Sequence, residues 1–206
     1  MEIIGITGGI ASGKSTVVKL LKKRYNFEII DADQLAREAV KKGSRGLRKI
    51  VDTFGERILT DQKELDRQQM GEMIAENQKV REELNAIVHP EVKKLYDQEI
   101  EELKKTNFPY IFYDCPLLCE VGLTKTVDEI FLIVANREVR LKRIVERDHV
   151  SVELAQKKID MQMKDEEKEK IADIIIENNG TKNDLLITLD CYLSKRKLWT
   201  KNQKNT

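Results

Sequence analysis

Residues 8–15 read Gly-Gly-Ile-Ala-Ser-Gly-Lys-Ser, and this run constrains the chain more than any other feature. It follows an apolar run at residues 3–6, and residues 16–21 after it have helical spacing. Glycines let successive backbone N–H groups converge on phosphate oxygens, Lys14 adds a positive charge there, and Ser15 can offer its hydroxyl to Mg²⁺. A helix N-terminus also favours anions. Because strand, loop and helix occur in the required order, the pattern predicts a nucleoside triphosphate site rather than an ordinary glycine-rich turn.

The composition limits the partners that such a chain can have. Its 206 residues suffice for one substantial core with inserted lobes. With 37 Lys+Arg against 36 Asp+Glu, the net charge of +1 argues against general affinity for nucleic acid. No apolar stretch approaches the ~18–20 residues that span a bilayer, and the N-terminus starts with a strand instead of a signal-like segment. We therefore expect a cytoplasmic protein with no nucleic-acid and no membrane partner.

The three cysteines, Cys115, Cys119 and Cys191, are odd in number and lack C-x-x-C spacing. Only His89 and His149 are available to complete a metal site with them. We therefore expect the cysteines to be small buried hydrophobic residues.

Five short apolar runs alternate with amphipathic helical patterns. They lie at residues 2–7, 27–31, 110–114, 128–134 and 173–177. This alternation predicts an α/β fold in which a parallel sheet has helices on both faces. Several runs are continuously apolar, which suits strands that are buried on both sides. Ligands of such a sheet gather at the carboxyl ends of the strands.

Two insertions interrupt this alternation. Residues 32–107 show helical periodicity, with predicted helices at 45–54, 65–76 and 78–105, and a break at 43–46. A simple crossover does not need that length, so we expect an inserted helical lobe that holds the second substrate. A small helical lid is expected at residues 137–165, with helices at 137–148 and 152–163. Residues 1–31, 108–136 and 166–206 then form the nucleotide-binding core, and the basic tail from 191 to 206 has no assigned function.

Asp31 and Asp33 stand at the end of the second predicted strand. Side chains two residues apart in an extended segment point to the same side, here toward the phosphate-binding edge. One carboxylate is a candidate to accept a proton from an attacking hydroxyl. Equally, one of them can cap the helix that begins near Gln34. The two roles are compatible, with one carboxylate for each.

Asp114 ends the third predicted strand. In a fold with a triphosphate loop, this position brings a carboxylate near Mg²⁺ or the triphosphate. An acidic residue at a strand end is otherwise often a turn former. Since the triphosphate loop is present, we favour the functional role.

Arg140, Arg143 and Arg147 recur at steps of three and four, which aligns them on one face of the predicted lid helix. The opposite face carries an apolar stripe made of Leu141, Ile144 and Val145. Guanidinium groups above a transferring phosphoryl group would stabilise its negative charge. The alternative is a solvated face paired with neighbouring carboxylates, and only the loop at residues 8–15 argues against it.

Signatures of other nucleotide-dependent classes are missing from the sequence. It has no Asn-Lys-x-Asp segment for guanine and no H-R-D or D-F-G element of protein kinases. These absences argue against a GTPase and a protein kinase, and they favour a kinase of a small molecule.

Five segments of the sequence form a combined pattern: TGGIASGKST at 7–16, DAD at 31–33, LNAIVHPEV at 84–92, DCPLLCE at 114–120 and ADIIIENNG at 172–180. Through these segments the chain resembles the dephospho-coenzyme A kinase family from its first strand to about Gly180. The third and fourth are the specific ones, a His-Pro that ends a helix in the inserted lobe and an Asp-x-Pro-Leu-Leu at the third strand. The resemblance implies a P-loop NTPase-type parallel β-sheet with an inserted helical substrate lobe and a small helical lid.

Two positions depart from the family pattern. Ala11 stands where many members have glycine, which is tolerable if its φ is negative. Cys119 stands where phenylalanine is usual before the glutamate, and it makes that neighbourhood smaller without removing a reactive group.

The resemblance implies that the γ-phosphate of ATP, bound with Mg²⁺, is transferred to the 3′-hydroxyl of dephospho-coenzyme A, the last step of coenzyme A synthesis. By position in the family pattern, the catalytic residues would be Asp33 as the base, Lys14, Arg140 and Arg143. ATP would be bound by Gly8, Gly9, Ala11, Ser12, Gly13, Lys14, Ser15, Thr16, Arg147, Asn178 and Gly180. The acceptor would be bound by Thr7, Asp31, Asp33, Arg37, His89, Asp114 and Leu117. Mg²⁺ would be bound by Ser15, with Asp114 acting through water.

Two rivals share part of this pattern. A kinase of another small acceptor, such as a nucleoside or its monophosphate, would have the same loop, lid and sheet. A non-catalytic nucleotide-dependent switch would bind ATP without turnover, but it leaves the carboxylates Asp31, Asp33 and Asp114 without a use. The surface charge is compatible with a monomer or a weak assembly, and we expect a monomer.

Overall fold

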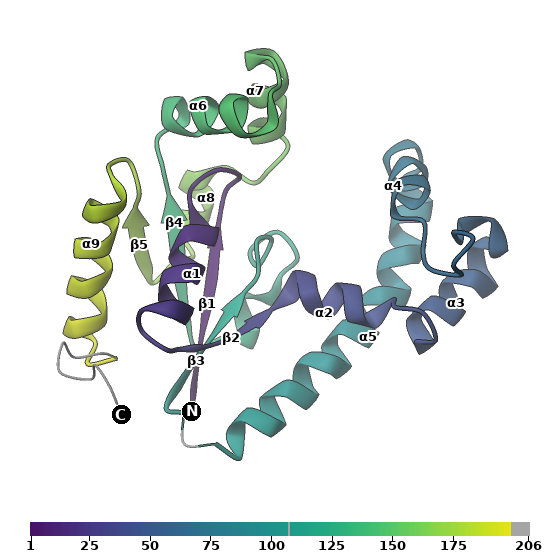
Figure 1. The fold of residues 1–206 in the computed structure, drawn as a ribbon, viewed down its shortest axis with the longest axis horizontal. Coiled ribbons are helices and arrows are strands. Elements are labelled where there is room, and N and C mark those ends of the chain that lie inside the picture. Colours follow the sequence, from purple (N-terminus) through teal and green to yellow (C-terminus); the bar gives the residue numbers. More distant parts are fainter. Residues whose placement is uncertain (107, 199–206) are drawn as a thin grey trace. The chain divides into compact units, whose positions relative to one another are not determined.

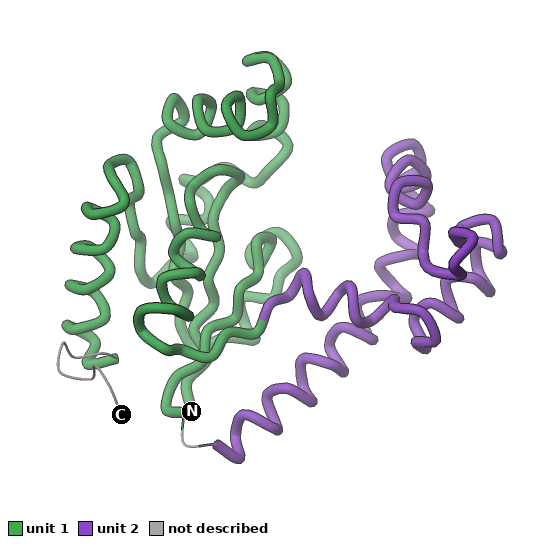
Figure 2. Tube along the Cα trace, viewed as in Figure 1, with its two compact units in different colours: residues 1–30, 108–206 green, residues 31–107 purple. Residues whose placement is uncertain are grey.

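A computed structural model describes residues 1–106 and 108–198. The chain divides into two compact units (Figure 2). The first consists of Met1–Ile30 and the chain from Phe108 onward, and the second is Asp31–Asn107. The residues expected to form the lid, 137–165, fall within the first unit.

The first unit is built on a parallel sheet. Its strands are β1 (Glu2–Gly8), β2 (Glu28–Asp31), β3 (Tyr110–Asp114), β4 (Glu129–Val134) and β5 (Ile174–Glu177). Their order is β2-β3-β1-β4-β5, and β1 pairs in parallel with both β3 and β4. The predicted α/β class and the five predicted strands are confirmed, with ends that differ by one residue at most. The central place of β1 puts the loop that follows it in the middle of the carboxyl edge.

Helices pack on both faces of this sheet (Figure 1). On one face, α1 (Lys14–Lys23) and α9 (Lys182–Lys195) share an apolar core with the strands. On the other, α8 (Asp165–Glu169) contacts β4, and the chain after β3 leads into a short 3₁₀ helix, η2 (Leu123–Thr126). Burial of each strand on two sides explains the continuously apolar sequences of β3 and β4.

The predicted lid is a pair of helices, α6 (Arg137–Asp148) and α7 (Val152–Asp160). Between them, His149 adopts the left-handed conformation at φ 53° and Ser151 caps α7. The prediction of one helix over residues 152–163 was wrong at its C-terminal end. The chain leaves the helix after Asp160 and starts again as α8, which the sequence analysis missed because five polar residues show no apolar periodicity.

The second unit is entirely helical among its described residues, apart from one isolated bridge between Leu59 and Leu65. It comprises α2 (Ala32–Ala39), α3 (Arg45–Phe54), the 3₁₀ turn η1 (Glu56–Ile58), α4 (Arg67–Glu76) and α5 (Gln78–Lys104). Its core includes Ile50, Phe54, Ile58 and Met70, packed against apolar residues of α5.

His89 and Pro90 do not end a helix, as the family pattern had led us to expect. They lie inside α5, which runs for 27 residues. A proline within a helix removes one backbone hydrogen bond, and its ring clashes with the carbonyl four residues earlier, which kinks or breaks a helix. Here α2, α3 and α4 all pack along α5, and this tertiary packing keeps the helix continuous through Pro90.

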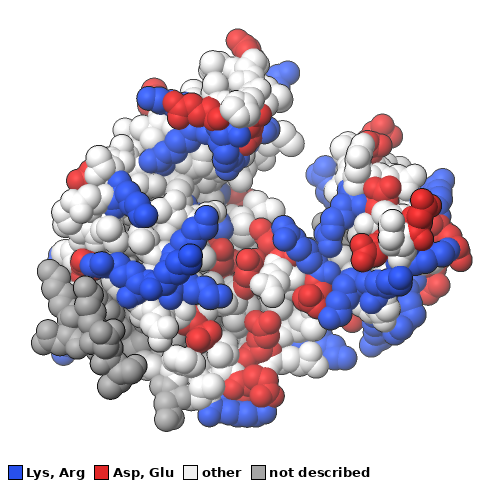
Figure 3. Space-filling model, in the orientation of Figure 1, with Lys and Arg blue, Asp and Glu red and all other residues white. Residues whose placement is uncertain are grey.

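Cys115 and Cys119 are buried, as predicted, whereas Cys191 is exposed on α9 and corrects that prediction. Among the described residues, no helix combines the length and apolar character that a membrane crossing requires. Lysine, arginine and carboxylate side chains are interspersed over the visible faces of the units (Figure 3), in keeping with the net charge of +1.

Candidate active site

The loop between β1 and α1 has the backbone of a phosphate cradle. Gly13 adopts a left-handed conformation at φ 98° immediately before α1, where its carbonyl accepts from the N–H of Thr16 at 2.8 Å. Gly8 and Gly9 allow close approach, since an added Cβ would lie 2.5 Å from Ile133 O or from Arg140 Nη2 respectively. These glycines therefore meet steric and dihedral needs that a larger residue would not.

Ala11 has a positive φ of 61°, which overturns the expectation of a negative one. This left-handed conformation raises the conformational energy of a residue that has a Cβ, whereas glycine adopts it freely. Packing offers a compensation, because Ala11 and Ile10 pack against the apolar side of the α6–α7 pair around Ile144 and Ala155. The loop thus turns its methyl group toward the helices of the predicted lid.

Lys14 and Asp114 meet at this edge. Lys14 Nζ lies 2.5 Å from Asp114 Oδ1, and both side chains are almost wholly buried, with 12% and 11% exposed. The register explains the contact, since Asp114 at the end of β3 pairs with Ile6 of β1, two residues before Gly8. The two predicted site residues are thereby brought together.

Ser15 and Thr16 begin α1 directly after this pair. Ser15 is exposed, so its hydroxyl is accessible to a cation. Magnesium keeps several waters and binds through one or two protein oxygens together with substrate phosphates. The combination of the Ser15 hydroxyl with the nearby Asp114 carboxylate is a donor set of that kind.

Arg140 is pinned beside the phosphate loop. Its side chain is 5% exposed, Nε donates to Ile10 O at 2.8 Å, and Nη1 lies 2.6 Å from Asp165 Oδ2. A buried guanidinium is stable here because a carbonyl and a carboxylate satisfy it. Arg140 does not belong to a solvated helix face.

Arg143 also reaches the loop. Its Nη1 donates to Ala11 O at 3.1 Å, and its Nη2 donates to Asn178 O at 2.9 Å. Asn178, which is 7% exposed, in turn donates from Nδ2 to Ser12 O at 2.8 Å. Gly180 follows in the same loop and is exposed. The loop after β5 and the helix α6 therefore grip the phosphate loop from two directions.

Arg147 behaves differently from the other two arginines. Its Nε donates to its neighbour Asp148 at 2.7 Å, and Lys158 of α7 lies 2.6 Å from the same carboxylate. Hydrogen bonds from Arg147 and Lys158 hold the pKa of the Asp148 carboxyl well below its ordinary value. In this structure Arg147 belongs to a cluster that fastens α6 to α7, not to the phosphate loop.

Two predicted acceptor residues of the first unit lie next to Asp114. Thr7 is fully buried, and its hydroxyl donates to Pro116 O at 3.0 Å, so here it supports the loop after β3. Leu117 on that loop is 44% exposed, which leaves its side chain available for contact with a ligand.

The remaining predicted acceptor residues belong to the helical unit. Asp31 is the N-cap of α2 and accepts from Gln34 N at 3.0 Å, so the capping role falls to Asp31 and not to Asp33. Asp33 and Arg37 are exposed, and their spacing of four places them on one face of α2. His89 is exposed on α5.

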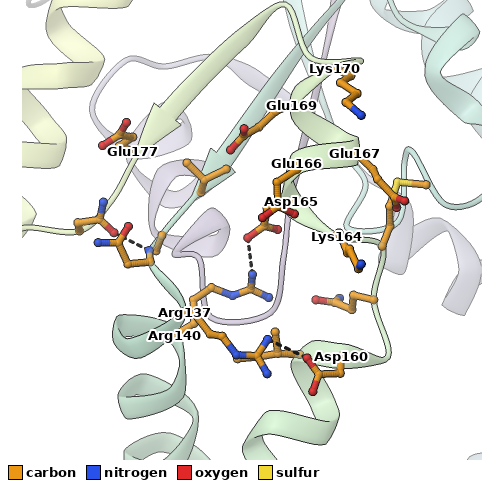
Figure 4. Close-up of a pocket in the computed structure, with 17 residues that line it drawn as sticks. Arg137, Arg140, Asp160, Lys164, Asp165, Glu166, Glu167, Glu169, Lys170 and Glu177 are labelled. Carbon is orange, nitrogen blue, oxygen red and sulfur yellow. Dashed lines mark hydrogen bonds and ion pairs between the residues drawn. The ribbon is translucent and has the colours of Figure 1, made fainter.

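A cavity of about 960 Å³ opens between the end of β4, the start of α6, the end of α7, and α8 (Figure 4). Its acidic lining residues outnumber its basic ones: Asp160, Asp165, Glu166, Glu167, Glu169 and Glu177 against Arg137, Arg140, Lys164 and Lys170. Two of these pairs are bridged, Arg140 to Asp165 and Arg137 to Asp160 (Figure 4). This excess of negative charge disfavours a triphosphate, and the residues of the phosphate loop do not line the cavity.

Two contacts of the phosphate loop were missed from the sequence. Gln162 Oε1 accepts from Ile10 N at 2.6 Å, and Asp165 holds Arg140. Gln162 lies just beyond α7, in the stretch that was assigned to a longer helix, and Asp165 is the first residue of the missed helix α8. The polar run at the end of the predicted lid gave no signal of these roles, because they depend on contacts with residues more than twenty positions away.

The model of the dephospho-CoA kinase family matches residues 2–184 of the chain. A dephospho-CoA kinase from Geobacter sulfurreducens is 41% identical over 196 residues, which cover 95% of this chain and 99% of the relative. One from Staphylococcus aureus is 39% identical over 194 residues, which cover 94% and 93%. The solved dephospho-CoA kinase from Campylobacter jejuni has a TM-score of 0.71 at 29% identity, with 95% and 96% of the two chains covered.

These likenesses extend over nearly the whole chain and include both the phosphate loop and the inserted helical unit. The chain therefore belongs to the dephospho-CoA kinase family, a family of kinases.

Proposed function

We propose that the protein transfers the γ-phosphate of ATP to the 3′-hydroxyl of dephospho-coenzyme A, giving coenzyme A and ADP. Membership of the family supports this reaction. The observation that carries it in this chain is the contact of Lys14 with Asp114 at 2.5 Å, at the carboxyl edge of the sheet. That contact joins the charge of a phosphate loop to a carboxylate suited to a magnesium shell.

On the donor side, the loop from Gly8 to Thr16 would hold the triphosphate through its backbone N–H groups. Lys14 would exchange Asp114 for the β- and γ-phosphates when ATP binds. Mg²⁺ would be bound by Ser15 and, through water, by Asp114, and it would neutralise charge on the phosphate oxygens. Asn178 and Gly180 would border the nucleotide, as would Arg147 after it leaves Asp148.

On the acceptor side, Asp33 would accept the proton of the attacking hydroxyl. Its exposure and its capping neighbour Asp31 support this assignment, because Asp31 already serves the helix and leaves Asp33 without a structural duty. Arg37 on the same face of α2 and His89 on α5 would hold the acceptor, together with Leu117. Residues 32–107 would be the acceptor lobe and 137–165 the lid.

Phosphoryl transfer of this kind passes through a loose in-line transition state, so positioning and charge neutralisation dominate the rate. Arg140 and Arg143 already lie against the phosphate loop, which supports a role in neutralising the transferred group. Exclusion of water during transfer would prevent hydrolysis of ATP.

The test is ADP release from Mg·ATP by the purified protein, with dephospho-coenzyme A, AMP, adenosine or no acceptor. We expect turnover with dephospho-coenzyme A alone. Turnover on AMP or adenosine instead would contradict the proposed acceptor. ATP binding without turnover on any acceptor would favour a nucleotide-dependent switch.

Two variants examine the assigned roles. Lys14→Ala should abolish transfer and leave the fold intact, and normal turnover in this variant would refute the assigned site. Asp33→Asn should lower turnover more than ATP affinity. Its matched control is Glu38→Gln, an exposed carboxylate on the same helix whose partner is Lys41, and this variant should turn over normally.

A further inference from the structure

The helix α8 carries a lysine that has no exposed surface. Lys168 of α8 is 0% exposed, and its Nζ lies 2.6 Å from Glu120 Oε1. Within the described residues, Lys168 Nζ and both carboxylate oxygens of Glu120 are buried and make no hydrogen bond. Each charge therefore depends on the other for its stabilisation.

Burial of such a pair carries a large desolvation penalty. Two charges taken from water regain the lost hydration only when further hydrogen bonds satisfy them, and apolar residues of similar volume often stabilise a protein as well or better. The neighbouring Cys119 is also buried, and this burial, with the charge of Glu120, raises the pKa of its thiol. An ion pair differs from apolar packing in being directional, which points to a geometric role.

Glu120 belongs to the loop of residues 115–122, which follows Asp114 at the end of β3 and carries Leu117. At its start, Cys115 N donates to Ile6 O at 3.1 Å, and Leu118 is fully buried against the sheet. At its far end, the side chain of Glu120 is the charged anchor. Leu117 is exposed between these two attachments.

The helix that holds Glu120 is also tied to the phosphate loop. Asp165 at the start of α8 binds Arg140 (Figure 4). Arg140 in turn donates to Ile10 O. Lys168, one turn later, binds Glu120. A helix of five residues thus connects the donor loop at one end with the loop after β3 at the other.

We propose that Glu120 and Lys168 are positioning residues that fix the loop of residues 115–122 relative to the phosphate loop, so that Leu117 meets the phosphoryl acceptor in a single geometry. The proposal rests on the proposed function, which supplies the acceptor. On this proposal, α8 keeps the phosphate loop and the loop of residues 115–122 at a constant separation.

The test compares Lys168→Met, Glu120→Gln and the double variant Glu120→Met/Lys168→Met with the unaltered protein. Lys168→Met leaves a buried carboxylate unpaired and should melt at a lower temperature. The double variant removes both charges and should regain the thermal stability. Lys170→Met, an exposed lysine two residues further on, is the matched control and should change neither stability nor kinetics.

In the double variant, we expect kcat/KM for dephospho-coenzyme A to fall by about ten- to a hundredfold, since a displacement near 1 Å costs that much. The KM for ATP should stay within about threefold, because the contacts of Arg140 with the phosphate loop are untouched. Glu120→Gln should show the same split. Amide hydrogen exchange at Val121 and Leu123, whose N–H groups bond back to Leu117 and Leu118, should be faster in the double variant than in the control.

A double variant with normal acceptor kinetics and normal exchange would overturn the proposal. An equal loss for ATP and acceptor would overturn it as well. If the unaltered protein does not phosphorylate dephospho-coenzyme A, the proposed function fails, and the exchange measurement still decides whether the pair holds the loop.

Discussion

Replacement of Asn178 by leucine should weaken the phosphate loop without changing side-chain volume much. Asn178 is 7% exposed, and its Nδ2 donates to Ser12 O at 2.8 Å. The amide packs so closely over Gly13 that a Cβ there would overlap it. After the substitution, Ser12 O keeps only the longer contact from Arg143 Nη1 at 3.3 Å among those of the described residues.

The magnitude follows from the loss of a buried hydrogen bond whose acceptor stays behind. Such a loss costs about 1–3 kcal/mol, and the weak contact from Arg143 places the expectation at the lower end, about 1–2 kcal/mol. If the substitution destabilises the ATP-bound conformation of the phosphate loop by the same free energy, the dissociation constant for ATP rises by about 5- to 30-fold. The free energy of unfolding and the affinity for ATP should therefore fall together.

The assay is urea unfolding together with ATP titration at constant Mg²⁺. Asn179→Leu is the matched control, because the adjacent asparagine is exposed and its side chain accepts a backbone hydrogen bond from Asn136 N. Its effect should stay below about 1 kcal/mol. Equal unfolding free energies and equal ATP affinities for the two variants would refute the inference that the Asn178 amide holds the phosphate loop.

Three further predictions concern separate parts of the first unit. Ala11→Val should lower the unfolding free energy by about 1–2 kcal/mol relative to Ala11→Gly, because a β-branched residue is poorly tolerated at positive φ; equal urea midpoints would contradict this. Burial, with the hydrogen bond to Asp190, raises the pKa of Tyr25 to about 12, so the folded state keeps the phenol proton. The stabilisation is present below pH 10 and is lost as the pH rises toward 12, and Tyr25→Phe should flatten that fall in unfolding measurements between pH 8 and 11. Asp114→Asn should free Lys14 for ATP and leave ATP binding at least as tight, while turnover falls by about 10–100-fold if the carboxylate orients magnesium-bound water; an unchanged kcat would remove Asp114 from that role.

The sequence by itself determined the fold class and the donor loop. Periodic apolar runs require a sheet that is buried on two sides, and a phosphate loop needs its glycines at fixed spacing, so both features can be recognised locally. The strands were predicted to within one residue for the same reason. The capping role at residues 31–33 was foreseen too, although spacing alone did not distinguish Asp31 from Asp33.

Only the tertiary structure decided how the loop is held. Arg140, Asp165 and Gln162 gather around Ile10 from separate segments, and the pairing of Lys168 with Glu120 joins residues 48 positions apart. Packing against neighbouring helices likewise accounts for the positive φ of Ala11. It also accounts for the continuity of α5 through Pro90. Local patterns encode which element forms, whereas the partners of buried charges depend on contacts distant in sequence, because only the folded chain removes those charges from water.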